Sequence, residues 1–168
     1  MHVVAQATDD SAVASISVAV DGDSLGAVGE DELPWSAAYA EVPVYTVMLD
    51  DGPTTVHVVA RDALGNDART DIAVLVDNTA PELTLSMPAT VTQTPVEVTG
   101  TVHDVSGITT LSFFVDGTSV AGIGDGVSGA FTQHVDLTCN KTSVITVRAT
   151  DRAGHQTVRH HELLCDNT

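Results

Sequence analysis

Along several stretches of this chain, apolar and polar residues alternate at every second position. A period of two is typical of β-strands that bury one face and leave the other in water. The stretch 15–20 shows it with Ile16, Val18 and Val20, and the stretch 55–60 shows it again. Asp-Gly pairs at 21–22 and 116–117 predict turns between strands. No convincing helical period appears, so the pattern predicts an all-β protein.

The sequence also repeats itself. The residues at 62–66, Asp-Ala-Leu-Gly-Asn, recur at 151–155 as Asp-Arg-Ala-Gly-His, and Asp-Asn-Thr follows at 77–79 and again at 166–168. An earlier stretch, 9–22, matches 104–117. Each Asp-x-x-Gly run predicts a short hairpin loop in which glycine takes the positive φ angle. The two halves therefore share their start and end, and the first half is slightly longer in the middle.

Positions expected to face the core repeat in step as well. A slip of one residue would turn every core side chain outward, so matching inward positions indicate a shared fold. These positions are Ile16, Val18, Val20, Val56, Val58 and Ala60 in the first half and Leu111, Phe113, Val115, Ile145, Val147 and Ala149 in the second. We therefore expect two small modules, residues 1–79 and 80–168.

The order of a strand, then D-x-x-G-N, then a strand that ends in Val-Asp-Asn-Thr-Ala-Pro at 76–81 resembles bacterial immunoglobulin-like, cadherin-like repeats. The second copy keeps Asp151 and Gly154 but has His155 in place of Asn. The resemblance implies two tandem immunoglobulin-like Greek-key β-sandwiches. Modules of this kind occur in adhesins, surface fibres and accessory regions of secreted hydrolases.

In that alignment the first module lacks its first strand. The segment 82–95, with Leu83, Leu85 and Met87, predicts this strand for the second module, and the first has no counterpart. We expect that the sequence is a fragment of a longer protein from which this strand has been removed. The alternative is that a strand from another chain pairs with the open edge. Residues 26–41 are expected to form a longer loop or one short turn.

Charge narrows the range of partners. The net charge is −17, from 23 acidic and six basic residues, and such a surface repels nucleic acids and anionic membranes. No apolar stretch is long enough to insert directly into a membrane. Two explanations of the acidity stay open: calcium sites, or a solubilising acidic surface suited to salty surroundings.

Calcium sites are suggested by a resemblance to the intermodule sites of cadherins. Calcium takes six to eight oxygen ligands, and the acidic and amide residues expected near the joint are Asp50, Asp51, Asp77, Asn78, Asp104 and Asp151. The loops that begin at Asp9 and Asp104 lack the Asp-x-Asp motif of cadherins, and no Asp-Arg-Glu precedes the linker. The alternative is that these side chains cap backbone N–H groups in turns.

Both cysteines lie in the second half. Cys139 shares its parity with Val135 and Leu137, and Cys165 shares its parity with Leu163, so both should face inward. We expect a Cys139–Cys165 disulfide, which implies an oxidising compartment. Two buried free thiols are the alternative.

Motifs for catalysis are missing. The chain has no Gly-x-Ser-x-Gly and no His-Glu-x-x-His, so we do not expect an enzyme. We expect a non-catalytic spacer, stalk or adhesin segment of a longer extracellular or cell-surface protein, whose partners are adjacent immunoglobulin-like modules. The alternative is an accessory module of a secreted hydrolase that binds a carbohydrate or protein, for which Trp35 and Tyr39 are the available aromatic residues.

Overall fold

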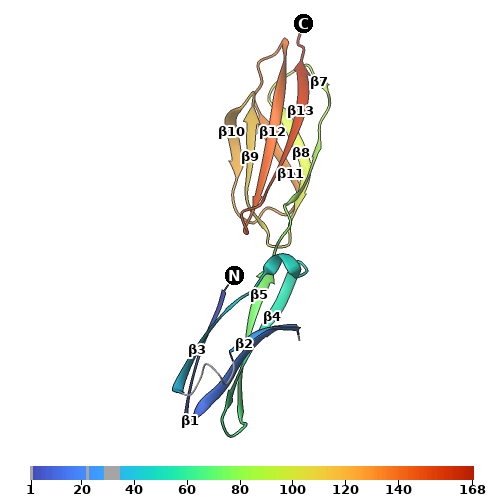
Figure 1. Ribbon diagram of the computed structural model, residues 1–168. Helices are drawn as coiled ribbons and strands as arrows, with labels where there is room; N and C mark the ends of the chain where they lie inside the picture. Colours follow the sequence, from blue (N-terminus) through green and yellow to red (C-terminus); the bar gives the residue numbers. More distant parts are fainter. Residues whose placement is uncertain (1, 22, 29–34) are drawn as a thin grey trace. The chain divides into compact units, whose positions relative to one another are not determined.

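The computed structural model describes residues 2–21, 23–28 and 35–168, with side chains for 2–21 and 39–168. The chain divides into two compact units, Met1–Asp77 and Asn78–Thr168, called here the first and second units. Each unit has its own sheets and its own buried core (Figure 1). The protein is therefore all-β, built from two separate packing units.

The second unit is a sandwich of two sheets. Its strands are β6 (Glu82–Ser86), β7 (Thr90–Val91), β8 (Val96–His103), β9 (Ile108–Val115), β10 (Thr118–Ile123), β11 (Gly129–Val135), β12 (Lys141–Asp151) and β13 (Gln156–Cys165). One sheet has the order β10-β9-β12-β13-β7 and the other β11-β8-β6. The chain crosses repeatedly between the sheets, which is the Greek-key order of immunoglobulin-like modules.

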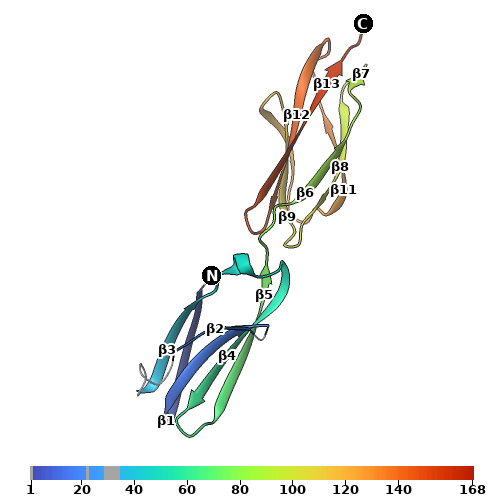
Figure 2. The same ribbon diagram turned by 45° about the vertical axis from the view of Figure 1, so that its right-hand side comes forward.

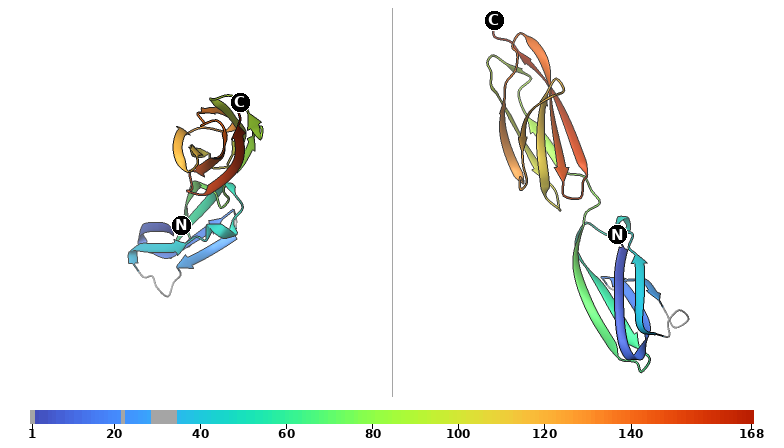
Figure 3. Two further views of the ribbon diagram at one scale, coloured as in Figure 1. Left: turned by 90° about the horizontal axis from the view of Figure 1, so that it is seen from above. Right: turned by 90° about the vertical axis from the view of Figure 1, so that its left-hand side faces the viewer.

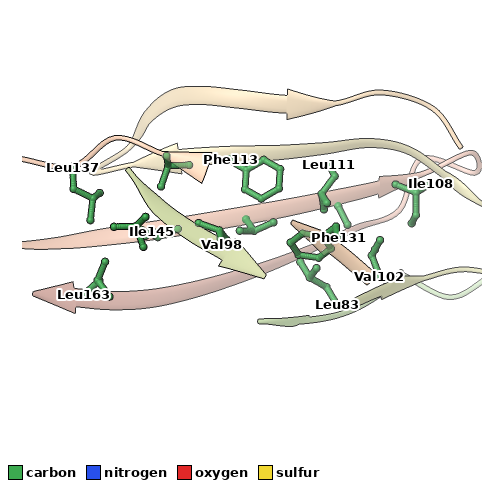
Figure 4. Packing of buried hydrophobic residues seen from close by; sticks show 14 of the residues in the cluster. Leu83, Val98, Val102, Ile108, Leu111, Phe113, Phe131, Leu137, Ile145 and Leu163 are labelled. Carbon is green, nitrogen blue, oxygen red and sulfur yellow. The ribbon is translucent and has the colours of Figure 1, made fainter. Parts of the chain in front are cut away.

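Aliphatic side chains from both sheets meet in the core of this unit (Figure 4). Phe113 and Phe131 are its two aromatic residues and pack edge to face, with ring centroids 5.8 Å apart. Leu111, Ile145 and Leu163 are fully buried around them. The alternation expected for β12 holds, because Ile145, Val147 and Ala149 point inward while the residues between them are more exposed.

Strand β6 covers one edge of this core. It pairs antiparallel with β8, with Leu83 opposite Val102 and Leu85 opposite Gly100 (Figure 2). Leu83 is 2% exposed. A Cβ atom at Gly100 would lie 2.0 Å from the carbonyl oxygen of Thr84, so the close approach of β6 requires glycine there. The strand expected within 82–95 is present as β6, followed by the short β7, which pairs parallel with β13.

The described residues of the first unit form five strands, and a 3-10 turn, η1 (Thr46–Met48), joins two of them. The strands are β1 (His2–Val20), β2 (Asp23–Val28), β3 (Trp35–Pro43), β4 (Gly52–Asp62) and β5 (Asp67–Val76). β1 serves two pairings: residues 2–8 pair with β3, and residues 13–20 pair with β2 and β4 (Figure 3). The described strands follow the order of the second unit from β8 onward.

Small aliphatic residues fill the core of the first unit. Val3, Val18, Val42 and Val56 form one buried cluster, and Val13, Ile16 and Ala40 form another. The inward positions expected at 16, 18, 20 and 56 are buried, whereas Val58 and Ala60 are only partly buried. This core is therefore less completely covered than that of the second unit.

The loop expected at 26–41 is wrong for most of that range. Strand β2 continues to Val28 and strand β3 begins at Trp35, while residues 29–34 lie outside the described part. Ala40 and Val42 face the core at alternate positions. Because alanine is depleted in strands, this alternation does not stand out in the sequence. The short turn occurs later, at Thr46–Met48. Among the described residues, no helix has the length and apolarity needed to cross a membrane.

Candidate functional site

Asp104, a predicted calcium ligand, lies in the turn between β8 and β9. Its Oδ1 accepts hydrogen bonds from the backbone N and Oγ of Ser106, both at 2.8 Å, and from the N of Gly107 at 3.2 Å. Asp9 does the same in the first unit, where Oδ1 accepts from the N of Ser11 at 2.7 Å and from its Oγ at 2.5 Å. Asp104 thus braces the turn between β8 and β9, whereas Asp9 makes the same two hydrogen bonds to Ser11 within the long strand β1.

Asp151 begins the hairpin between β12 and β13. Its side chain is fully buried, and its Oδ1 accepts hydrogen bonds from the N of Gly154 at 2.6 Å and the N of His155 at 2.8 Å. Nδ1 of His155 lies 3.2 Å from Oδ2. The hairpin also contacts the neighbouring turn, because the N of Arg152 donates to the O of Gly107 at 3.1 Å.

The first unit repeats this hairpin with Asp62. Its Oδ1 accepts from the N of Leu64 at 2.9 Å and the N of Asn66 at 2.7 Å, and Nδ2 of Asn66 donates to Oδ2 at 2.6 Å. The amide side chain and the backbone of Asn66 are the main causes that lower the pKa of Asp62. The N of Ala63 donates to the O of Ala12 at 3.0 Å, as Arg152 does to Gly107. Glycine has positive φ in both hairpins, +91° at Gly65 and +98° at Gly154, as the sequence predicts.

A third pair of aspartates braces the Asp-Gly turns. Asp116 accepts hydrogen bonds from Nζ of Lys141 at 2.7 Å and from the N of Val144 at 2.8 Å, and these bonds, led by that from Lys141, lower its pKa. Asp21 accepts from Oγ1 of Thr54 and from the N of Thr55 at 3.2 Å, and its pKa is lowered chiefly by the bond from Thr54. Sequence reasoning identified both turns. It missed that each aspartate is hydrogen-bonded to the first strand of the last hairpin, which is β4 in the first unit and β12 in the second.

The remaining predicted calcium ligands belong to connections. Asp50 and Asp51 are exposed and lie between η1 and β4. Asp77 and Asn78 follow β5 and are partly buried. Asp77 is the last residue of the first unit and Asn78 the first of the second. Within the second unit, Asp104 and Asp151 occupy neighbouring turns, as expected. A shared calcium ion for the whole set stays a prediction.

Cys139 and Cys165 form a disulfide, with their Cα atoms 4.5 Å apart. Cys165 is fully buried and Cys139 packs partly buried against the same core. At the position that matches Cys165, the first unit has Val76, which is also buried. Buried Val76 therefore occupies in the first unit the position that Cys165 of the disulfide occupies in the second.

An aromatic residue on the outer face of the second unit was not singled out from the sequence. Phe114 is partly buried on β9, and the guanidinium carbon of Arg148 on β12 lies 5.0 Å from its ring centroid. Both line a depression of about 220 Å³ together with Gly117, Thr146 and Val158. Tyr39 is 60% exposed, and the side chain of Trp35 lies outside the described part.

Similarity to known proteins is found at the level of structure and not of sequence. No protein-family model matches it, and no curated protein sequence is significantly similar. Among solved structures, it resembles the fibronectin(III)-like modules of Clostridium thermocellum CbhA, with 15% identity over 98% of this chain and 85% of that one, and a TM-score of 0.45.

Two further solved structures are similar to it. A 1.5-MDa bacterial ice-binding adhesin shares 15% identity over 99% of this chain, with a TM-score of 0.46. A Bacteroides ovatus protein, SGBP-B, determined with a mixed-linkage heptasaccharide, shares 17% identity over 97%, with a TM-score of 0.31. The chain spans 58% and 41% of these two structures. The strand order of each unit, rather than these similarities, defines the fold.

Proposed function

We propose that the chain is a non-catalytic pair of immunoglobulin-like modules that serves as a spacer, stalk or adhesin segment in an extracellular or cell-surface protein. The observation that carries this proposal is the repeated turn chemistry. Asp9, Asp21 and Asp62 form the same kinds of side-chain hydrogen bonds to the same backbone positions as Asp104, Asp116 and Asp151. Units that repeat in this way are suited to being added in series.

The disulfide supports the location. Disulfides persist in secreted and surface proteins and are rare in reducing compartments. Mass spectrometry of the natural protein, taken from its own cells under alkylating conditions, is expected to find Cys139 and Cys165 joined. Alkylated thiols at both positions in freshly isolated protein would contradict an extracellular location.

A module exchange tests the spacer function. We expect a parent protein in which residues 1–168 are replaced by an unrelated immunoglobulin-like pair of the same length to keep its surface function. Deletion of the same residues should reduce that function, because the terminal domains lose reach. If the replacement is as harmful as the deletion, the segment carries specific recognition and is not a spacer.

Calcium binding by the predicted set is part of this proposal and has its own test. A ligand that binds only the native state raises the melting temperature, so millimolar calcium should raise it more than sodium chloride of equal ionic strength. Asp50→Asn should reduce the difference, since Asp50 belongs to the predicted set and is exposed. Equal shifts with calcium and sodium chloride would leave screening of the −17 charge as the explanation.

One observation favours a second candidate, recognition of a carbohydrate or protein. The Phe114–Arg148 pair lines a depression on the outer sheet surface, and aromatic residues and arginine are enriched where proteins bind partners. Phe114→Ala should abolish glycan-array or surface binding if this face is the binding site. Binding that survives Phe114→Ala and Arg148→Ala would eliminate this candidate.

A further inference from the structure

The first unit neutralises the cations on the outer face of its last hairpin. Arg61 on β4 lies with its Nε 2.6 Å from Oδ1 of Asp67 on β5. Arg69 on β5 lies with its Nε 2.8 Å from Oδ1 of Asp71. Nδ1 of His57 is also 2.7 Å from Asp71. Each arginine of this face therefore has a carboxylate partner within the unit.

The second unit lacks both of these acids. Gln156 and His160 hold the positions that Asp67 and Asp71 hold in the first unit. Arg148 on β12 lies on the same outer face, and among the residues that the structure describes no carboxylate forms an ion pair with it. In a chain with a net charge of −17, this face carries a local charge of the opposite sign.

An aromatic ring holds Arg148 in place. The guanidinium carbon lies over the ring of Phe114, 5.0 Å from its centroid, which is a cation–π contact. The N–H donors of a guanidinium lie in its plane, so a ring that contacts its face leaves them available. Arg148 is therefore oriented without being neutralised, and less conformational entropy is lost when a ligand binds to it.

Arg148 borders a depression of about 220 Å³. The residues that line it are Phe114, Gly117, Thr146, Arg148 and Val158, and none of them is acidic. The hydroxyl of Thr146 lies 2.8 Å from Nδ1 of His160, so a hydroxyl and an adjacent imidazole are present besides the guanidinium. The depression is smaller than sites for drug-sized ligands, and it suits a single ring.

Given that this face recognises a partner, as in the second candidate function above, we infer that the depression binds a carboxylated sugar residue of the uronate type on an otherwise uncharged glycan. The planar fork of Arg148 binds the carboxylate through two parallel hydrogen bonds. The ring hydroxyls reach Thr146, and the apolar side of the ring lies on Val158. A polyanionic glycan fits less well, because the −17 charge of the chain repels it.

The position on a sheet face favours a sugar over an acidic peptide. The backbones of β9 and β12 pair with neighbouring strands on both sides, so this face presents side chains alone. A peptide carries a backbone donor and acceptor at almost every residue, and these groups would find few partners here. A sugar ring, in contrast, carries its carboxylate and hydroxyls within a volume that matches the depression.

The test is an NMR titration of the full chain. Methyl β-glucuronide is the probe, and methyl β-glucoside is the matched control, in which a hydroxymethyl group replaces the carboxylate. We expect the glucuronide to shift the side-chain N–H of Arg148 and the amide of Thr146 saturably. The glucoside should bind at least about tenfold more weakly, since it cannot form the charge-assisted hydrogen bonds.

Variants of the outer faces provide controls. Arg148→Gln should abolish the preference for the glucuronide. Val158→Asp places a carboxylate directly opposite Arg148, as the first unit does beside its arginines, and should weaken binding at least about tenfold. The uncharged Val158→Asn should keep the preference. Arg69→Gln should leave binding unchanged, because that arginine is already paired with Asp71.

The outcomes distinguish the ligand class from recognition by this face. Equal binding of the two sugars, or glucuronide shifts that persist in Arg148→Gln, would overturn the carboxylated sugar. If N-acetylglutamate amide binds at Arg148 more tightly than the glucuronide, recognition by this face stands and the sugar is wrong. If none of the three probes shifts Arg148 at roughly tens of millimolar, both the sugar and recognition of carboxylates here are wrong, and the module exchange still decides the spacer function.

Discussion

Replacing Asp151 with alanine should destabilise the second unit strongly. The carboxylate is completely buried and accepts two short backbone hydrogen bonds from Gly154 and His155. Hydrogen bonds to a charged group contribute about 1.5 to 3 kcal/mol each. Part of this is recovered in the variant, because Gly154 is exposed and His155 partly exposed, so water can reach the freed N–H groups. Removing a charge that is costly to bury offsets a further part of the lost free energy. We therefore expect the free energy of unfolding of the second unit to fall by about 2 to 3 kcal/mol.

Asp62→Ala is the matched control. Asp62 makes equivalent backbone hydrogen bonds, but these are exposed, and water replaces exposed hydrogen bonds at small cost. We expect a loss of about 1 kcal/mol or less in the first unit. The comparison tests the contribution of burial, because each carboxylate braces the last hairpin of its unit and accepts a hydrogen bond from the backbone N four residues further on. The second backbone donor differs, Leu64 for Asp62 and Gly154 for Asp151.

Equilibrium denaturation can resolve the two units separately. Trp35, Tyr39 and Tyr45 all lie in the first unit, and the second has no tryptophan or tyrosine. Fluorescence therefore follows the first unit, while far-UV circular dichroism follows both. Asp151→Ala should shift the circular dichroism transition of the second unit and leave the fluorescence transition in place. A loss below about 1 kcal/mol, or an equal loss in both variants, would refute the argument from burial.

Two further predictions concern the backbone and pH. Ala12 has φ +84°, and Gly107, at the matching position of the second unit, has φ +86°. Because glycine tolerates a positive φ better than alanine, Ala12→Gly should stabilise the first unit by about 0.5 to 1 kcal/mol, as measured by the fluorescence transition. Gly107→Ala should destabilise the second unit. Hydrogen bonds hold the pKa values of folded Asp62 and Asp116 below the usual value of an aspartate. The stability that these residues contribute is therefore present above about pH 4 and is lost as the pH falls through their folded pKa values. Melting temperatures measured from pH 6 to pH 2.5 should fall in this acidic range, and Asp116→Asn should flatten the dependence of the second unit.

Much of this architecture could be predicted from residue spacing. The period of two identified β12 and its inward residues, and the matching Asp-x-x-Gly runs identified both hairpins, because these features depend on neighbours in sequence. The strand at 35–43 is not evident from the sequence, since one of its two described inward residues is Ala40, and its described outward residues, Tyr39, Glu41 and Pro43, follow no clear polar pattern. Propensity is weak evidence where packing against β1 determines the strand.

The bracing aspartates show where spacing alone is insufficient. Asp116 was assigned to a turn, yet its partners Lys141 and Val144 lie more than twenty residues away in sequence. Which backbone amides approach a carboxylate depends on how strands β9 and β12 pair, and no local pattern encodes it. The same holds for the difference in core coverage between the units, which becomes visible only when the partly buried Val58 is compared with the fully buried Val147.

The repeated bracing also changes how the acidity should be tested. Asp104 and Asp151 belong to the predicted calcium set, yet both already accept hydrogen bonds from backbone amides. A carboxylate oxygen keeps lone pairs that can bind a cation, so bracing and calcium binding are compatible. Substitution of either residue, however, would weaken calcium binding simply by loosening a turn. Asp50 lies outside these turns and is exposed, and for this reason its asparagine variant separates a true ligand from a structural carboxylate.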